Sequence, residues 1–144
     1  MKWRIVAIPI ACVGLFEMLC ATPGQGQKQR SVMDGVYTAE QAKRGADTYT
    51  ARCAMCHGAG MQGGPEAPAL TGAEFLYSWG GKTAGALYNY MRATMPPTEQ
   101  GSLSDQRYAD LLAAVFQKNE YPAGKTELPA DPKALADVVI PKDQ

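Results

Sequence analysis

The sequence has no excess of charge of either sign, because its 144 residues include 14 Lys and Arg and 14 Asp and Glu. A protein that binds nucleic acid needs a concentrated basic face, so we predict no nucleic-acid partner. The chain is also too short to favour two domains. With 46% apolar and 19% charged residues, its composition is typical of one soluble globular domain.

The apolar run at residues 5–16 is too short to span a bilayer comfortably, because a spanning helix needs about 20 residues. The run follows the positive residues Lys2 and Arg4. A positive start before a short apolar segment is typical of an export signal. We therefore predict a signal peptide over residues 1–21.

Cleavage of that signal after Ala21 would leave no segment stably inserted in a membrane. We expect an exported protein of the bacterial periplasm, with an uncleaved membrane anchor as the alternative. Attachment of a lipid to Cys20 is disfavoured, because Leu19 stands where lipoproteins usually have a small residue.

The sequence lacks any clear strand pattern and any internal repeat, which favours a helical protein. Thr38 and Gln41 form a capping box, and Ser104 is a further cap. Together with apolar periodicity, these signals predict helices over residues 39–52, 73–77, 84–94 and 105–118. Residues 57–72 form a long loop rich in Gly and Pro, and such loops are usually functional or lie against a ligand.

The domain organisation follows from composition. We predict a flexible linker over residues 22–36, a folded domain over residues 37–121 and a Pro-rich extension over residues 122–144. Asp131 and Pro132 could begin a last short helix in this extension. Short helices and long loops bury little apolar surface, and a domain of about 100 residues is then marginal. A large apolar cofactor would fill the centre.

Cysteine and histidine are scarce after residue 21, where only Cys53, Cys56 and His57 occur. They form the motif Cys-x-x-Cys-His, which in an exported protein predicts covalent attachment of a c-type haem. The two thiols add across the two vinyl groups of haem, and the two-residue gap matches the vinyl spacing once the segment turns. His57 then lies beneath the iron and supplies a neutral imidazole ligand.

Two other interpretations of the cysteine pair are a redox disulfide and half of a zinc site. A zinc site needs two further Cys or His ligands, and the chain beyond residue 21 offers none. A thioredoxin-like pair lies at a strand-to-helix turn in a βαβ unit, whereas this motif ends a predicted helix. Attached haem is therefore the preferred interpretation.

The second axial ligand cannot be another histidine of this chain, because His57 is the only one. The methionines beyond the signal are Met33, Met55, Met61, Met91 and Met95. We expect Met95, because it ends a predicted helix and two prolines stiffen the chain after it. Met91, on an apolar helix face, is the alternative. A thioether ligand raises the reduction potential, and two filled axial positions favour outer-sphere electron transfer.

The chain resembles the class I monohaem cytochrome c family over residues 37–121. Gly45 and Tyr49 stand two helical turns and one turn before Cys53, as in the family. Further likenesses are the Pro-x-Leu-x-Gly stretch at residues 68–72, the Met95-Pro96 pair and the helix at residues 104–116.

The resemblance implies an all-α cytochrome c fold, with three to five short helices and long loops around one haem. It implies an electron carrier rather than an enzyme. It also implies that the Pro68 carbonyl accepts from the second nitrogen of His57 and that Leu70 packs on the haem face. Trp79, with nearby Tyr77, could donate a hydrogen bond to a haem propionate.

One helix contact is expected, and one departure from the family is visible. Gly45 would let the C-terminal helix approach the first helix closely. The family often has an aromatic residue three positions after the packed leucine. If Leu111 is that leucine, the position holds Ala114, and the aromatic residue is Phe116 instead.

We predict a monomer that shuttles single electrons between exported or membrane redox partners, such as a dehydrogenase, a membrane oxidoreductase or a terminal oxidase. One alternative is a dedicated cytochrome partner or subunit of a quinoprotein dehydrogenase, which residues 75–95 and 119–129 loosely resemble. The other is a haem sensor or peroxidase, which would need an open iron position.

Overall fold

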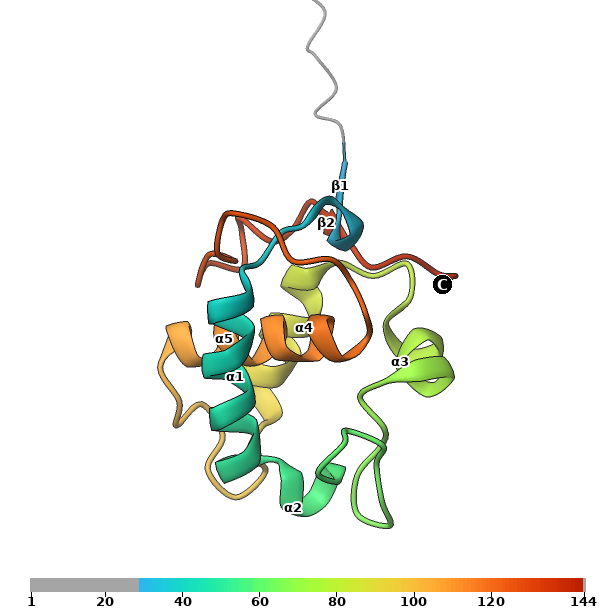
Figure 1. The fold of residues 1–144 in the computed structure, drawn as a ribbon. Coiled ribbons are helices and arrows are strands. Elements are labelled where there is room, and N and C mark those ends of the chain that lie inside the picture. Colours follow the sequence, from blue (N-terminus) through green and yellow to red (C-terminus); the bar gives the residue numbers. More distant parts are fainter. Residues whose placement is uncertain (1–28, 144) are drawn as a thin grey trace, which may run out of the picture.

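Two helices that are far apart in the sequence cross at the centre of the protein (Figure 1). The computed structural model describes residues 29–143, so the predicted signal peptide and the first part of the predicted linker lie outside the described residues. The helices are α1 (Ala39–Arg52), α2 (Ala54–His57), α3 (Gly72–Trp79), α4 (Ala84–Thr94) and α5 (Asp105–Lys118), with a 3-10 turn η1 (Val32–Asp34). Two short strands, β1 (Arg30–Ser31) and β2 (Val138–Val139), accompany them. The predicted helical class is confirmed.

The crossing of α1 and α5 depends on small residues. A Cβ atom on Gly45 would lie 1.8 Å from the carbonyl oxygen of Asp110 and 2.9 Å from the Cβ of Ala114. No side chain fits there, so Gly45 has the predicted role. Ala114, where the family often has an aromatic residue, contributes its small side chain to this crossing.

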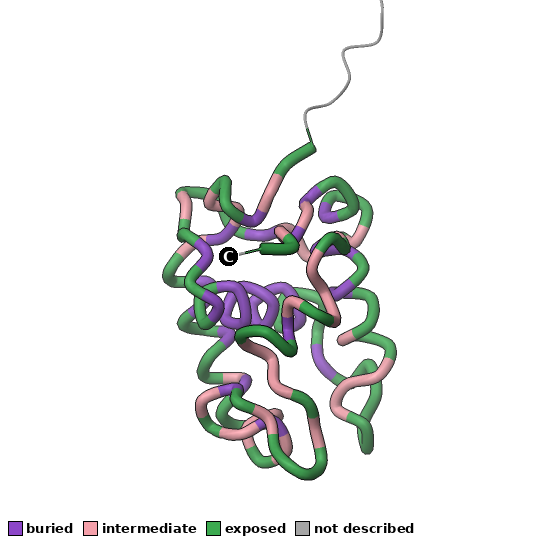
Figure 2. Tube along the Cα trace, turned by 90° about the vertical axis from the view of Figure 1, so that its right-hand side faces the viewer, coloured by how far each residue is buried: buried purple, intermediate pink, exposed green. Residues whose placement is uncertain are grey.

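Helix α5 is the core of the protein. All residues from Tyr108 to Phe116 are buried, and this helix forms the continuous buried segment in Figure 2. Phe116 packs edge-on against Tyr121 with ring centroids 5.8 Å apart, and it also contacts Tyr37 at 6.5 Å. Phe116 therefore packs against Tyr121, just before the C-terminal extension, and against Tyr37, two residues before α1.

The C-terminal extension is part of the fold. Leu128, Leu135, Val138 and Ile140 are buried in it. The Leu135 carbonyl accepts a hydrogen bond from the Gly85 N–H of α4 at 3.0 Å, and β2 pairs in parallel with β1. The two ends of the described chain thus lie side by side (Figure 1).

Two predictions about these ends are wrong. The extension has turns over residues 132–137 followed by β2, not a short helix. Its backbone groups pair with other elements, such as the Ile140 N–H with the Lys82 carbonyl at 2.9 Å. Residues 30–36 are not a flexible linker either, because they contain β1 and η1 and bury Val32 completely.

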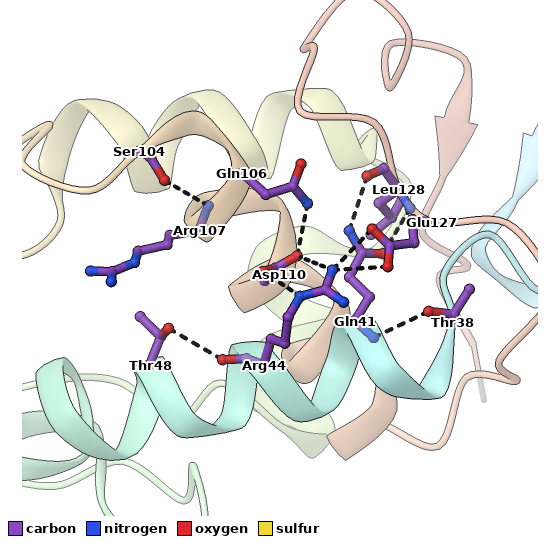
Figure 3. A network of polar contacts seen from close by, with 10 residues as sticks. All are labelled: Thr38, Gln41, Arg44, Thr48, Ser104, Gln106, Arg107, Asp110, Glu127 and Leu128. Carbon is purple, nitrogen blue, oxygen red and sulfur yellow. Dashed lines mark hydrogen bonds and ion pairs between the residues drawn. The ribbon is translucent and has the colours of Figure 1, made fainter.

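A polar network fastens the extension to both crossing helices (Figure 3). Gln41 is fully buried, and its side chain bonds to the Leu128 N–H at 2.7 Å and to the Leu128 carbonyl at 3.0 Å. Arg44 pairs with the buried Asp110 of α5 at 3.0 Å and with Glu127 at 2.9 Å. Only half of the predicted capping box forms, because Thr38 caps the Gln41 N–H while the Gln41 side chain turns to the extension.

No helix among residues 29–143 is both long enough and apolar enough to cross a bilayer.

Candidate haem-attachment site

The Cys-x-x-Cys-His motif forms the corner between α1 and α2. Cys53 ends α1, with its N–H bonded to the Tyr49 carbonyl, and at the same time begins the single turn of α2. Its carbonyl accepts from the His57 N–H at 3.0 Å. Both Cys53 and Cys56 are free thiols in the structure and are partly buried. Burial raises the pKa of the Cys53 thiol, against the opposing effect of Arg52, so this thiol stays protonated at neutral pH.

His57 is held in one orientation. Its side chain is 8% exposed, and its Nδ1 lies 2.8 Å from the Pro68 carbonyl oxygen. Because a carbonyl only accepts hydrogen bonds, Nδ1 carries the proton and Nε2 keeps a free lone pair. The hydrogen bond that the resemblance implied is present. It prepares one nitrogen to bind a metal and fixes the plane of the ring.

The loop at residues 58–71 is shaped by left-handed backbone positions. Gly63 has φ +78°, and a Cβ atom there would lie 2.6 Å from the Ala69 nitrogen, so the loop can fold back on itself only with glycine. Met61 is a buried residue with φ +64°. Its carbonyl accepts a hydrogen bond from the Leu70 N–H at 2.8 Å. These contacts place the Pro68 carbonyl within hydrogen-bond distance of the His57 ring.

Sequence reasoning missed the role of the Tyr49 hydroxyl group. This group donates a hydrogen bond to the Gly58 carbonyl, directly after the motif. Burial raises the pKa of Tyr49 to about 12. The hydroxyl therefore stays protonated and keeps α1 tied to the first residue of the loop. Only the aromatic character of Tyr49 could be used from the sequence.

Among the side chains expected around the haem, Leu70, Met91 and Trp79 are partly buried and pack against the hydrophobic core. Trp79 is 5.2 Å from Tyr90, ring centroid to centroid, and the Lys82 Nζ lies 4.9 Å from the Trp79 ring.

Tyr77 is 93% exposed, so its ring points to solvent. Of the two proposed propionate donors, Trp79 is therefore the one that packs against the core.

Met95 is positioned by its backbone. It follows α4, its N–H bonds to the Met91 carbonyl at 2.9 Å, and its carbonyl accepts from the Tyr108 hydroxyl at 2.7 Å. Tyr108 is fully buried and lies edge-on to Tyr88. Nothing in the sequence indicates that the Tyr108 hydroxyl would hold the residue expected to bind iron.

The donor set fits a haem. It consists of two free thiols, one imidazole with a single free nitrogen, and a thioether on a separate element. Within the described residues, no three His, Cys, Asp or Glu side chains gather as a protein-only metal site would require. An imidazole and a thioether are donors that haem iron takes from protein side chains, and a porphyrin would supply four further nitrogens.

Comparison with known proteins agrees with this chemistry. The family model described as cytochrome c oxidase, cbb3-type, subunit III matches residues 40–113, just over half of the chain. No significant match was found among curated proteins or among solved structures. The matched segment runs from α1 into α5 and contains the whole attachment motif and the loop. The chain therefore belongs to this family of class I monohaem c-type cytochromes, has the cytochrome c fold, binds a c-type haem covalently and transfers electrons.

Proposed function

We propose that Cys53 and Cys56 hold the haem by thioether bonds and that His57 and Met95 are the axial ligands of its iron. When bound, the haem supplies a reversible one-electron change between ferrous and ferric iron. By addition to the vinyl groups of the haem, the two thiols would each replace an S–H bond with an S–C bond, and the hydrogen would go to the neighbouring vinyl carbon. This addition leaves the iron oxidation state unchanged.

The observation that carries the proposal is the contact of 2.8 Å between His57 Nδ1 and the Pro68 carbonyl. This hydrogen bond leaves Nε2 as the nitrogen that is free to bind iron. It also makes the imidazole a stronger electron donor to a metal. A thioether from Met95 would favour the ferrous state. Tyr108 supports this ligand, because its hydroxyl fixes the Met95 carbonyl at 2.7 Å.

We propose docking of redox partners at the surface of the motif. Met55, between the two cysteines, is 96% exposed. Residues 53–81 include only two charged side chains, Glu66 and Glu74. Such a surface suits brief encounters with small buried area. The partner class is an exported dehydrogenase, a membrane oxidoreductase or a terminal oxidase, and we place the processed, monomeric protein in the periplasm.

The experiment compares Met95→Ala with Met91→Leu in the haem-loaded protein. We expect Met95→Ala to abolish the weak long-wavelength absorption band of ferric iron–sulfur ligation and to allow rapid carbon monoxide binding to the reduced form. Met91→Leu, which conserves side-chain volume four residues earlier in α4, should keep the band and exclude carbon monoxide.

If the band were lost in Met91→Leu and kept in Met95→Ala, the iron ligand would be Met91. Rapid carbon monoxide binding by the wild-type protein would instead favour a sensor or peroxidase with an open iron position.

A further inference from the structure

One buried side chain, Asn119, holds the loop that carries Pro68 and Leu70. Asn119 follows α5 and is 4% exposed. Its Nδ2 donates to the Leu70 carbonyl at 2.8 Å and to the Val115 carbonyl at 2.9 Å. Its Oδ1 accepts from the Gly72 N–H at 3.1 Å. The side chain therefore ties the end of the core helix to the loop on both sides of Thr71.

The same short stretch of loop also contacts the histidine. The Pro68 carbonyl bonds to His57 Nδ1 at 2.8 Å, and only Ala69 separates Pro68 from Leu70. Two residues span at most ~7 Å of extended chain. A displacement of Leu70 is therefore passed on to the Pro68 carbonyl.

The loop has other anchors near this point. The Ala69 N–H, which belongs to the same peptide unit as the Pro68 carbonyl, donates to the Glu74 carboxylate of α3 at 3.2 Å. The Leu70 N–H bonds to the Met61 carbonyl at 2.8 Å, and the Thr71 hydroxyl bonds to the same carbonyl at 3.3 Å. Met61 itself belongs to the loop. Glu74 therefore connects the stretch to α3, and Asn119 connects it to the buried core helix α5.

We propose that Asn119 is a positioning residue that sets the strength of the hydrogen bond between Pro68 and His57 and so tunes the reduction potential. The proposal rests on His57 being an iron ligand, as proposed above. A strong acceptor at Nδ1 raises the basicity of the imidazole, which stabilises ferric iron. A displaced Pro68 carbonyl weakens this effect, so loss of Asn119 raises the potential.

The test uses two variants of Asn119 in the haem-loaded protein. Asn119→Leu removes the three hydrogen bonds to Leu70, Val115 and Gly72. Asn119→Asp keeps the acceptor for Gly72 but cannot donate to Leu70. One control, Asn89→Leu, makes the same substitution at an exposed position of α4. A second control, Leu135→Ala, removes a fully buried side chain of the C-terminal extension and lowers stability without touching the loop.

Two quantities are measured: the reduction potential, and the exchange rate of the His57 Nδ1 proton in the reduced protein by NMR. We expect Asn119→Leu to raise the potential and to speed this exchange by at least about tenfold, as an opened hydrogen bond allows. Asn119→Asp should also speed the exchange, because its carboxylate repels the Leu70 carbonyl, whereas its negative charge stabilises ferric iron and opposes the rise in potential. Both controls should keep the wild-type potential and exchange rate.

Unchanged values in Asn119→Leu would overturn the proposal, as would an equal shift in Leu135→Ala, which would indicate general loosening. If Asn119→Leu does not fold, the exchange rate in Asn119→Asp decides, and an unchanged rate there would overturn the proposal. A wild-type protein without a low-spin haem spectrum would refute ligation by His57 itself. A normal wild-type spectrum with unaltered Asn119 variants would refute only the role of Asn119.

Discussion

The crossing of α1 and α5 and the loop at residues 58–71 are held by different kinds of contact. At the crossing, small residues let two helices touch along their backbones, and α5 is buried from Tyr108 to Phe116. In the loop, turns and hydrogen bonds converge on the histidine, and its residues are mostly exposed or half-buried. The crossing therefore provides stability, and the loop provides the geometry of the proposed iron ligand.

The largest expected effect is on the crossing. Gly45→Val would force a branched side chain against the Asp110 carbonyl, which already lies 1.8 Å from where a Cβ would stand. We expect a loss of unfolding free energy of about 3 kcal/mol or more. Urea unfolding measures it, with Ala46→Val, at an exposed neighbouring position of α1, as the matched control. Equal losses in the two variants would contradict the close approach.

The helices show how far the sequence could predict this fold. The ranges predicted at residues 39–52, 84–94 and 105–118 match α1, α4 and α5. Their signals are local, because capping residues and apolar periodicity lie within each helix.

The ends of the chain could not be predicted in this way. β1 pairs with β2 across the whole domain, Arg30 with Val138, and such a pairing leaves no local pattern. The sequence predicts Gln41 only as the partner of Thr38 in a capping box, and its partner in the folded protein, Leu128, lies 87 residues away. Likewise, the motif revealed Cys53 and His57, whereas Tyr108 and Asn119 act through hydrogen bonds that only the folded chain brings together.

A second, smaller effect concerns the extension that covers the crossing. Gln41→Leu would leave both the N–H and the carbonyl of Leu128 buried without their partner. We expect a loss of about 2–4 kcal/mol in unfolding free energy, since each unpaired buried group costs about 1–3 kcal/mol. Gln117→Leu, exposed on α5, is the control. If the loss in Gln41→Leu did not exceed that in Gln117→Leu, the extension would not be fastened as described.

A third effect links the two regions through Tyr49, which reaches from α1 to the Gly58 carbonyl. Its pKa is raised from 10.0 to about 12 in the folded protein, first by burial. A raised pKa contributes stability that is complete below pH ~10 and is lost as the pH rises toward about 12.

Unfolding free energy measured from pH 9 to pH 12 should therefore fall. The decrease should be shallower in Tyr49→Phe, although burial raises the pKa of Tyr37, Tyr88 and Tyr121 as well. An identical pH dependence in Tyr49→Phe and the wild-type protein would show that this hydroxyl titrates normally.

The smallest effect concerns the surface of the motif. Because residues 53–81 have only Glu66 and Glu74 as charged side chains, electron exchange with small redox complexes should depend weakly on salt. We expect rate changes of less than about tenfold between low and physiological ionic strength for both cationic and anionic complexes. A steep dependence for one sign of charge would mean that electrons pass through another, more charged surface.

The most direct test of the account is the visible spectrum of the purified wild-type protein, oxidised and reduced, before and after denaturation. We expect sharp low-spin bands on reduction, the weak iron–sulfur band on oxidation, and haem that stays on the chain when the protein is unfolded. Haem that separates on denaturation would contradict thioether bonds to Cys53 and Cys56, and a high-spin spectrum of the native protein would contradict ligation by His57 and Met95.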